Sequence, residues 1–329
     1  MLEIFFKFKF LRKIFRVVKK SFFRVTGFIN IFKMKRELDA LYTLFYNQVH
    51  DLDNSLDVSS KQTQEVFSTQ WNQFDDGQLL VDSDSWFKEN CIRFLCEQEV
   101  QIKPEWFKGK NVLDAGCGNG RWAYALAKLG ANYTGVDINK IALEKTKELI
   151  KDIDVKKEFI HSSLEDILEK LPEDNKFDLV ISWGVVHHVK SFNLALDNLT
   201  KLVKDDGILY LYLYGQESVP FDEELRIFKE RVKYNNLTSD DERYNFLLKK
   251  SWGIKRRVHS NHDFFAPLIN RRLDFNYNQD FLVNRGFDNV VRTQKHPEIF
   301  VRAINGNLEK YKEYILPPNT DPLWIEKYS

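Results

Sequence analysis

Val112-Leu-Asp-Ala-Gly-Cys-Gly-Asn-Gly120 is the segment from which the fold of this chain can be predicted. Val112-Leu-Asp114 predicts a short buried strand, the glycines predict a tight turn, and the Ala-rich stretch 122–129 predicts a helix. Gly116 and Gly118 permit positive φ and a close approach of the backbone to a ligand. Amides at the start of a helix attract a carboxylate or a phosphate. The segment therefore predicts a strand–turn–helix unit that binds an anionic group.

Two acids and the glycine spacing limit which ligand this segment can bind. The glycines follow G-x-G-x-G, whereas a dinucleotide site has G-x-G-x-x-G. Asp114 ends the first strand and can accept a hydrogen bond from an ammonium, and Asp137 ends the next strand, where an acid holds ribose hydroxyls. The implied ligand has an ammonium, a carboxylate and a ribose but no pyrophosphate. S-adenosylmethionine (SAM) fits this description, and NAD fits it less well.

Strands and helices alternate on the C-terminal side of this segment. Strands are predicted at 133–137, 157–161, 177–183 and 207–214, with helices at 139–151 and 192–204. Such alternation is typical of a parallel α/β sheet. A helix at 277–285 and strands at 288–294 and 298–304 follow later, and the short connection Gln294–Glu298 predicts a hairpin. We expect a Rossmann-like parallel sheet that ends in an antiparallel hairpin.

The chain divides into six segments by composition and rhythm. Residues 215–275 are charged and aromatic and contain no strong strand, so we expect a helical insertion that covers the substrate. The predicted segments are a basic amphipathic arm (1–60), a helical aromatic-rich lid (61–110), the core (111–214), the insertion (215–275), the completion of the core (276–309) and a tail (310–329).

The N-terminal arm combines one apolar helical face with many cations. Residues 1–36 hold eleven basic residues and one acid, so this segment carries +10 and leaves about −9 for the rest of a chain whose net charge is +1. Apolar residues step by three and four along one helical face: Ile4, Phe8, Leu11, Phe15, Val18, Phe22, Val25, Ile29 and Phe32. Three interpretations stay open: a helix in a membrane interface, a coiled coil, or a helix that packs on its own domain.

Composition excludes several classes of protein. Hydrophobic residues make up 43% and charged residues 29% of the chain, which is ordinary for a soluble globular protein. No apolar run approaches the roughly 20 residues that span a bilayer, and no apolar signal-peptide core is present. The three cysteines have no zinc-site spacing and suit a reducing compartment. We expect a cytoplasmic protein, peripheral at the inner membrane face if the arm binds lipid.

These motifs resemble the class I SAM-dependent methyltransferases of the type 11 (ubiquinone/menaquinone-like) group. Val112–Gly120, Gly135-Val-Asp137 and Phe177-Asp-Leu-Val180 carry the resemblance, which covers roughly 110–214 and 277–304. It implies a seven-stranded sheet whose last strand is antiparallel. A bacterial subgroup, whose members often accompany surface-glycan or natural-product genes, is also similar at four places: Phe67-Ser-Thr-Gln-Trp-Asn-Gln-Phe74, Pro104–Lys110, Trp183-Gly-Val-Val-His-His188 and His262-Asp-Phe-Phe-Ala-Pro267.

The resemblance implies a set of cofactor-binding residues. Ile138 would pack on adenine, and the family's adenine-side acid falls on Ser163, for which Glu165 or Asp166 are possible substitutes. The expected cofactor-binding residues are Asp114, Gly116, Cys117, Gly118, Gly120, Asp137, Ile138, Ser163, Leu164 and Trp183.

Candidate chemical groups lie past the fourth predicted strand and in the insertion. His187 and His188 sit at the carboxyl edge of the sheet, where α/β proteins bind ligands, and a histidine suits a general base. We prefer His188. Ubiquinone O-methyltransferases bind a divalent ion here through Glu-x-x-Glu-His, but Gly184 and His187 replace both carboxylates, so no metal is predicted. The expected substrate contacts are Tyr214, His262, Asp263 and Trp71.

The expected activity is methyl transfer from SAM to an O, N or C acceptor on a small molecule, sugar or lipid-linked substrate. Two alternatives stay open: a SAM-binding module without catalysis, and an RNA methyltransferase that uses the basic arm. The acidic remainder of the chain argues against a nucleic-acid partner. The sequence predicts no particular oligomeric state.

Overall fold

A computed structural model describes residues 57–73, 84–254 and 257–317 of the chain. Residues 1–56 of the predicted amphipathic arm (1–60), residues 74–83 of the predicted lid (61–110) and residues 318–329 of the predicted tail lie outside these ranges. No helix within the described ranges has both the length and the apolar character needed to cross a membrane.

The core is one seven-stranded sheet in the order β3-β2-β1-β4-β5-β7-β6. The strands β1 to β5 pair in parallel, and β7 pairs antiparallel with both β5 and β6. This confirms the predicted Rossmann-like sheet with an antiparallel end. The strands are β1 (Asn111–Ala115), β2 (Asn132–Asp137), β3 (Lys157–His161), β4 (Phe177–Trp183), β5 (Val203–Leu213), β6 (Phe287–Arg292) and β7 (Ile299–Asn305).

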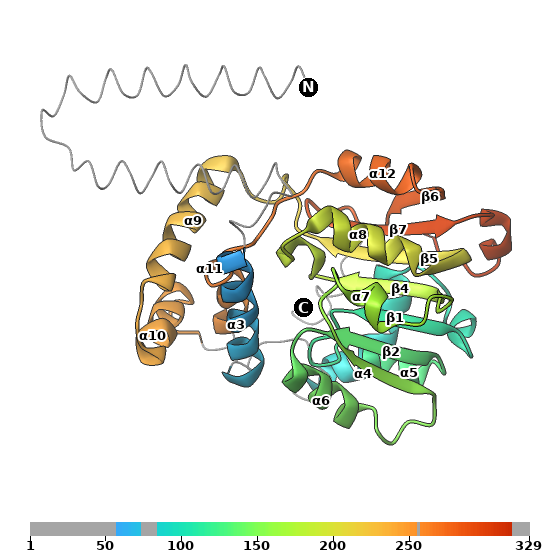
Figure 1. Ribbon diagram of the computed structural model, residues 1–329, viewed down its shortest axis with the longest axis horizontal. Helices are drawn as coiled ribbons and strands as arrows, with labels where there is room; N and C mark the ends of the chain where they lie inside the picture. The colour runs from blue at the N-terminus through green and yellow to red at the C-terminus, as the bar shows by residue number, and fades with distance from the viewer. Residues whose placement is uncertain (1–56, 74–83, 255–256, 318–329) are drawn as a thin grey trace, which may run out of the picture. The chain divides into compact units, whose positions relative to one another are not determined.

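Helices cover both faces of the sheet (Figure 1). Successive side chains of β1 point to opposite faces, so Val112 joins one buried apolar cluster while Leu113 joins the other. The first cluster includes α5 (Ala123–Lys128) and Leu143 of α6 (Lys140–Leu149). The second lies against α7 (Ile167–Lys170), α8 (Phe192–Lys201) and α12 (Phe275–Val283).

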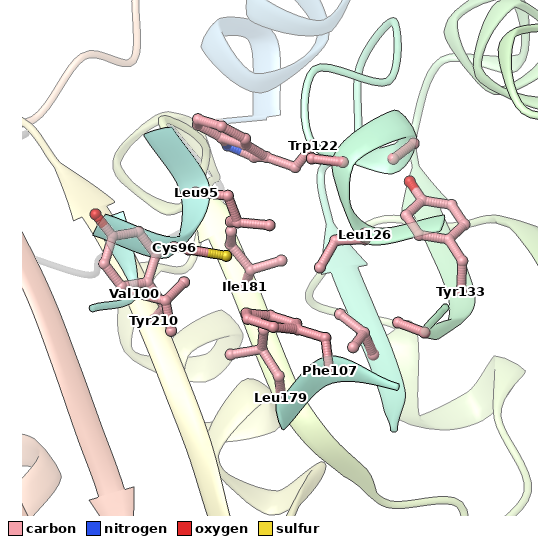
Figure 2. Close-up of a cluster of buried hydrophobic side chains, with 14 of the residues drawn as sticks. Leu95, Cys96, Val100, Phe107, Trp122, Leu126, Tyr133, Leu179, Ile181 and Tyr210 are labelled. Carbon is pink, nitrogen blue, oxygen red and sulfur yellow. The ribbon is translucent and has the colours of Figure 1, made fainter. Parts of the chain in front are cut away.

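An N-terminal segment closes the first face. It consists of α4 (Ser85–Arg93), the π-helix Phe94–Glu99 and the 3-10 helix Pro104–Phe107. Figure 2 shows Leu95, Cys96 and Phe107 of this segment facing Leu179, Ile181 and Tyr210 of the sheet. The prediction of helix in 61–108 is therefore confirmed for α4, and for most of α3 (Asp57–Gln73).

The insertion after β5 is helical, as predicted. It contains α9 (Phe221–Asn235), α10 (Asp240–Lys250) and α11 (Val258–Phe265), which we call the cap. A capping box formed by Ser239 and Glu242 begins α10. The cap has an apolar cluster of its own, formed by Ile227, Tyr234, Leu247, Val258, Phe265 and Ala266.

The helix α3 packs with the cap although the two are far apart in sequence (Figure 1). Gln62 Nε2 donates to Asn235 Oδ1 at 2.6 Å and to the Ala266 carbonyl at 2.9 Å. The backbone amide of Ile269 donates to Thr63 Oγ1 at 3.1 Å. These bonds make α3 and the segment that leaves the cap one structural unit.

A buried ionic cluster joins the cap to the sheet. Glu224 of α9 accepts from Arg231 Nη1 at 2.9 Å and from Arg272 Nε at 3.2 Å, and all three side chains are at most 2% exposed. Arg272 Nη1 also donates to Glu298 Oε1 at 3.1 Å, next to the start of β7. Two arginines thus face two glutamates, so the buried charges compensate one another.

Candidate functional site

A cavity opens at the carboxyl ends of β1, β2 and β4, the edge where open α/β sheets bind ligands. We divide its lining into two halves. The loop half includes Asp114, Gly116, Cys117, Gly118, Asn119, Asp137, Ile138, Ser162, Ser163, Leu164 and Glu165. The cap half includes Phe67, Gln70, Arg121, Trp183, His188, Tyr212, Tyr214, His259 and Asp263.

The glycine loop requires glycine for two different reasons. A Cβ on Gly116, whose φ is +87°, would lie 2.4 Å from Cγ2 of Val185. Gly120 does not line the cavity; a Cβ there would meet Leu149 at 3.0 Å and Thr146 at 3.1 Å. Gly120, which was among the expected cofactor-binding residues, therefore acts on the packing of the loop against α6 and not on the cavity lining.

The two acids of the loop half are both buried. Asp114 Oδ2 accepts from the Tyr133 hydroxyl at 3.0 Å, and burial raises the pKa of Asp114 to about 7. Asp137 accepts from the amides of Gly118 and Asn139, each at 2.8 Å. Burial raises the pKa of Asp137, while these amides oppose the rise. Each carboxylate is therefore fixed in position at the end of a strand.

Unpaired polar atoms indicate that the loop half is built to receive a polar ligand. Asn119 Oδ1 and Trp122 Nε1 are buried without a hydrogen-bond partner in the described part of the chain, and both residues line the cavity. Leaving such an atom unpaired costs about 1–3 kcal/mol, so a ligand that pairs with them would recover stability. Ile138 adds an apolar surface that is 37% exposed.

The expected adenine side departs from the family pattern as the sequence suggested. Ser163 lines the cavity, but its hydroxyl donates to Asp166 Oδ2 at 2.7 Å. Of the two acids considered as substitutes, Glu165 lines the cavity and Asp166 does not.

The two adjacent histidines face different surroundings. His188 lines the cavity, and its Nδ1 lies 2.8 Å from the Ile269 carbonyl. Because a carbonyl only accepts, Nδ1 carries the proton and Nε2 is left as an acceptor. His187 does not line the cavity; it is fully buried and stacks on Tyr214 with ring centroids 3.9 Å apart. Burial lowers the pKa of His188 to about 3 and also holds the pKa of His187 well below its usual range, so both rings are neutral near pH 7.

His262 and Asp263, which the sequence analysis grouped as substrate contacts, point to different sides of α11. His259 and Asp263 are four residues apart, share one face and line the cavity, whereas His262 is buried edge-on to Tyr234 within the cap. Burial lowers the pKa of His262 to about 3. The expectation that His262 contacts substrate therefore does not agree with its position. Tyr214 lines the cavity, and the side chain of Trp71 lies outside the described part of the chain.

Two residues of this region, Arg121 and Glu99, escaped sequence reasoning, and a third, Gln70, had been singled out only as part of the Phe67–Phe74 motif. Arg121 follows the glycine loop and lies over the Trp183 ring, with its guanidinium carbon 4.1 Å from the ring centroid. Glu99 accepts from Trp183 Nε1 at 3.1 Å and from the Tyr210 hydroxyl, and burial raises the pKa of Glu99 to about 7. Gln70 Nε2 donates to Asp263 Oδ1 at 2.6 Å. The only local sequence signal for these residues was the position of Arg121 directly after Gly120.

Within the described ranges, no group of three or more His, Cys, Asp or Glu side chains is arranged to hold a metal ion.

Comparison with known proteins identifies the type of domain. Residues 107–258 match a family model described as a methyltransferase domain. The chain is 31% identical over 176 residues to the mitochondrial ubiquinone biosynthesis O-methyltransferase of Schizosaccharomyces pombe, covering 50% of this chain and 63% of that protein. It is 34% identical over 111 residues to the enzyme of the same name from Vibrio atlanticus, covering 34% of this chain and 46% of that one. The chain spans about half the length of the curated relatives it matches.

Among solved structures, the chain is similar to a magnesium protoporphyrin IX methyltransferase from Synechocystis with bound SAM. The TM-score is 0.45 at 16% identity, and the match covers 77% of this chain and all of that one.

Proposed function

Because the chain contains a class I SAM-dependent methyltransferase domain, we propose that this protein transfers a methyl group from SAM to an oxygen or nitrogen of a small molecule. A sugar or a lipid-linked molecule is the acceptor we favour. The observation that carries the proposal is the single cavity in which the glycine loop and its two acids face the polar groups of the cap.

The residues of the loop half fit SAM. Asp114 would accept from the ammonium of SAM, and Asp137 would hold the ribose hydroxyls. Ile138 offers an apolar surface to adenine, while Asn119 and Trp122 have buried polar atoms that still lack partners among the described residues. Tyr133 supports this arrangement by fixing one oxygen of Asp114.

The cap half would hold the acceptor. SAM, when bound, supplies a methyl group on a positively charged sulfur. The residues of the chain then have to orient the acceptor and exclude water, since alignment and desolvation supply much of the rate. His188 is neutral and presents Nε2 as an acceptor, so its role is to orient a donor group of the acceptor molecule. Residues 215–275 act as the substrate cap through His259 and Asp263 of α11.

Labelling in a native-host extract tests the proposal. The full chain is incubated with methyl-labelled SAM, and lipid, glycan, RNA, protein and small-molecule fractions are separated. We expect label in the small-molecule, glycan or lipid fraction, and its loss with Asp114→Ala. SAM binding without any labelled fraction would favour a non-catalytic SAM-binding module, and label in RNA would favour an RNA methyltransferase.

Residues 1–36 would hold the enzyme at an anionic membrane surface. Their charge of +10 and the helical spacing of their apolar residues, many of them Phe, support this interpretation. Flotation with anionic vesicles should carry the full chain upward, and a chain without residues 1–36 should remain with the soluble fraction. Equal flotation of both chains, or of neither, contradicts the proposal.

The cap offers a second candidate contact with the same surface. Trp252 is 83% exposed and lies between α10 and α11, with the Arg257 guanidinium 5.7 Å from its ring. Lys249 is also nearby in sequence, and residues 243–262 contain no acid. An exposed tryptophan among cations suits a membrane interface. Trp252→Ala should weaken flotation less than deletion of residues 1–36.

A further inference from the structure

The cap half holds a cation and an acid that line the same cavity and act on each other without forming an ion pair. Arg121 and Asp263 both line the cavity, and Asp263 is the strongest charge acting on Arg121. No ion pair within 4.0 Å joins Arg121 to any acid among the described residues. Opposite charges in one pocket that do not meet leave space for a group that interacts with both.

The surroundings of Arg121 hold its donors free for a ligand. The guanidinium carbon lies 4.1 Å from the centroid of the Trp183 ring, and a guanidinium over an aromatic ring can still donate its N–H groups to other partners. Trp183 is itself fixed, because its Nε1 donates to buried Glu99 and its ring lies 4.5 Å from the Tyr212 ring. Arg121 makes no hydrogen bond to another described residue, so its donors point to whatever enters the cavity.

Arg121 acts on the cap half and not on the loop half. The acids that act most strongly on it are Asp263 of α11 and Glu99, which accepts from Trp183 at the end of β4. Neither Asp114 nor Asp137 is influenced by it appreciably. This position separates Arg121 from the groups that would hold the ammonium and the ribose of SAM.

Asp263 has one oxygen engaged and one oxygen free. Oδ1 accepts from Gln70 Nε2 at 2.6 Å, whereas the contact of Oδ2 with His259 Nε2 is 3.8 Å, beyond hydrogen-bond distance. The side chain is 27% exposed in the cavity. Gln70 thus holds the carboxylate by one oxygen and leaves the other for a proton of the acceptor.

We propose that the reacting group of the acceptor is a hydroxyl bound between Asp263 and Arg121. This inference rests on the proposed function. Asp263 Oδ2 takes the proton of this hydroxyl, and Arg121 stabilises the oxygen as it becomes negative. The oxygen uses a lone pair for the new bond to the methyl carbon, and the electrons of the broken carbon–sulfur bond stay on sulfur. Asp263 then returns the proton to water.

The charges favour oxygen over nitrogen as the acceptor atom. A hydroxyl becomes more negative as its proton leaves, and the adjacent guanidinium stabilises that change. An amine that attacks becomes positive, which the same guanidinium opposes. Burial raises the pKa of Asp263 to about 6, near the pH of the cell, whereas the pKa of His188 is about 3. A base near neutral pH is the more effective one.

The test compares two residues of the same face of α11. With the labelled fraction as substrate, Asp263→Asn should lower kcat by about 100-fold or more, while His259→Gln should lower it by only a few-fold. Asp263→Glu should recover part of the loss. Calorimetry should give a SAM affinity unchanged in all three, which also shows that each variant is folded. The label should resist alkali and be released by hydriodic acid, as expected of a methyl ether.

The pH profile adds a second measurement. Arg121, Tyr214, His259 and Gln70 surround Asp263 from four segments of the chain. With SAM saturating at every pH, the wild-type kcat/KM for the acceptor should rise with pH through a pKa near 6, and this rise should be absent in Asp263→Asn. Arg121→Gln should reduce turnover about 100-fold with SAM affinity unchanged.

Several outcomes would overturn the inference. If kcat of Asp263→Asn were within threefold of the wild-type value, Asp263 would not be the general base. A loss of SAM affinity in Arg121→Gln would assign Arg121 to the carboxylate of SAM, and an N-methyl product would exclude the hydroxyl. If the wild-type chain labels no fraction, the proposed function itself fails and this inference fails with it.

Discussion

The two halves of the cavity are built in different ways. The loop half comes from residues 114–165, in which each strand end is followed directly by the next helix of the sheet. The cap half needs α3, the ends of β4 and β5, and α11, and its hydrogen bond between Gln70 and Asp263 joins residues 193 positions apart. A site for a common cofactor is thus local in sequence, whereas the site for a particular acceptor depends on distant segments.

The largest loss of stability should come from a mutation in the buried ionic cluster that joins the cap to the sheet. Glu224→Gln leaves Arg231 and Arg272 facing each other with one acid less, and breaking a buried pair costs about 3–5 kcal/mol. We expect urea unfolding to show this loss of stability and labelling to show weak acceptor methylation. SAM affinity, measured by calorimetry under folded conditions, should be unchanged. The matched control is Glu223→Gln, whose exposed pair with Arg226 is worth less than about 1 kcal/mol.

If Glu224→Gln reduced SAM affinity as much as acceptor turnover, the two halves would not be independent.

Gly116→Ala should weaken SAM binding by the loop half and leave the cap half unchanged. The added Cβ would lie 2.4 Å from Val185 and the residue would keep a φ of +87°, so the loop has to move. Strain of about 1–3 kcal/mol at such a position, together with the clash, predicts a loss of SAM affinity of about 100-fold. The control is Gly109→Ala, which has a φ of +74° and no atom within 4 Å of the new Cβ. Similar losses in both variants would show that general strain, not the approach to Val185, is responsible.

A smaller effect should follow from the pKa of Asp114. Its value of about 7 means that half of the apo protein carries a proton there at neutral pH. An ammonium ligand favours the ionised carboxylate, so binding below this pKa requires loss of a proton. SAM affinity should therefore fall about tenfold between pH 8 and pH 6, with proton release on binding. Calorimetry in buffers of different ionisation enthalpy measures both quantities. Asp114→Asn should bind weakly at every pH, and a dependence that persists in it would assign the titration to Asp137 or another neighbour.

The smallest effect should come from Tyr133→Phe. The Tyr133 hydroxyl stabilises the ionised form of Asp114, so its removal raises the pKa of Asp114. A hydrogen bond to a charged group contributes about 1.5 kcal/mol, which corresponds to a shift of about one unit. The pH dependence of SAM binding should move upward by up to that amount. Tyr124→Phe, which alters a tyrosine of α5 outside the cavity, serves as the control.

Prediction from sequence succeeded where the determinants are local. Short apolar runs and glycine turns placed every strand of the sheet, because those patterns depend on neighbours in the chain. The start of β5 was missed: it begins at Val203, four residues before the predicted Gly207, since Lys204-Asp205-Asp206 has no strand character. Tertiary contacts bring these polar residues into the strand, and such contacts cannot be read from a local sequence pattern.

The cap half could be predicted only in part. Two adjacent histidines do not reveal which one faces a cavity, because the 3-10 turn Val186–His188 sends their side chains to different neighbours. The contacts of Gln70 with Asp263 and of Glu99 with Trp183 join distant segments, so no spacing in the sequence signals them. The subgroup motifs did include both Gln70 (in Phe67–Phe74) and Asp263 (in His262–Pro267), but neither motif indicates that the two side chains meet.

The pairing of α3 with the cap has a consequence for synthesis of the protein. Hydrogen bonds of Gln62 and Thr63 reach residues 173 to 206 positions later. Contacts of such separation form late in folding, after local strand–helix units. On the ribosome, the glycine loop and β1 to β4 emerge and can assemble while α3 still waits for its partners. The chain therefore acquires its cofactor pocket before it acquires its acceptor pocket, and an arrested nascent chain would be able to hold the donor without being able to use it.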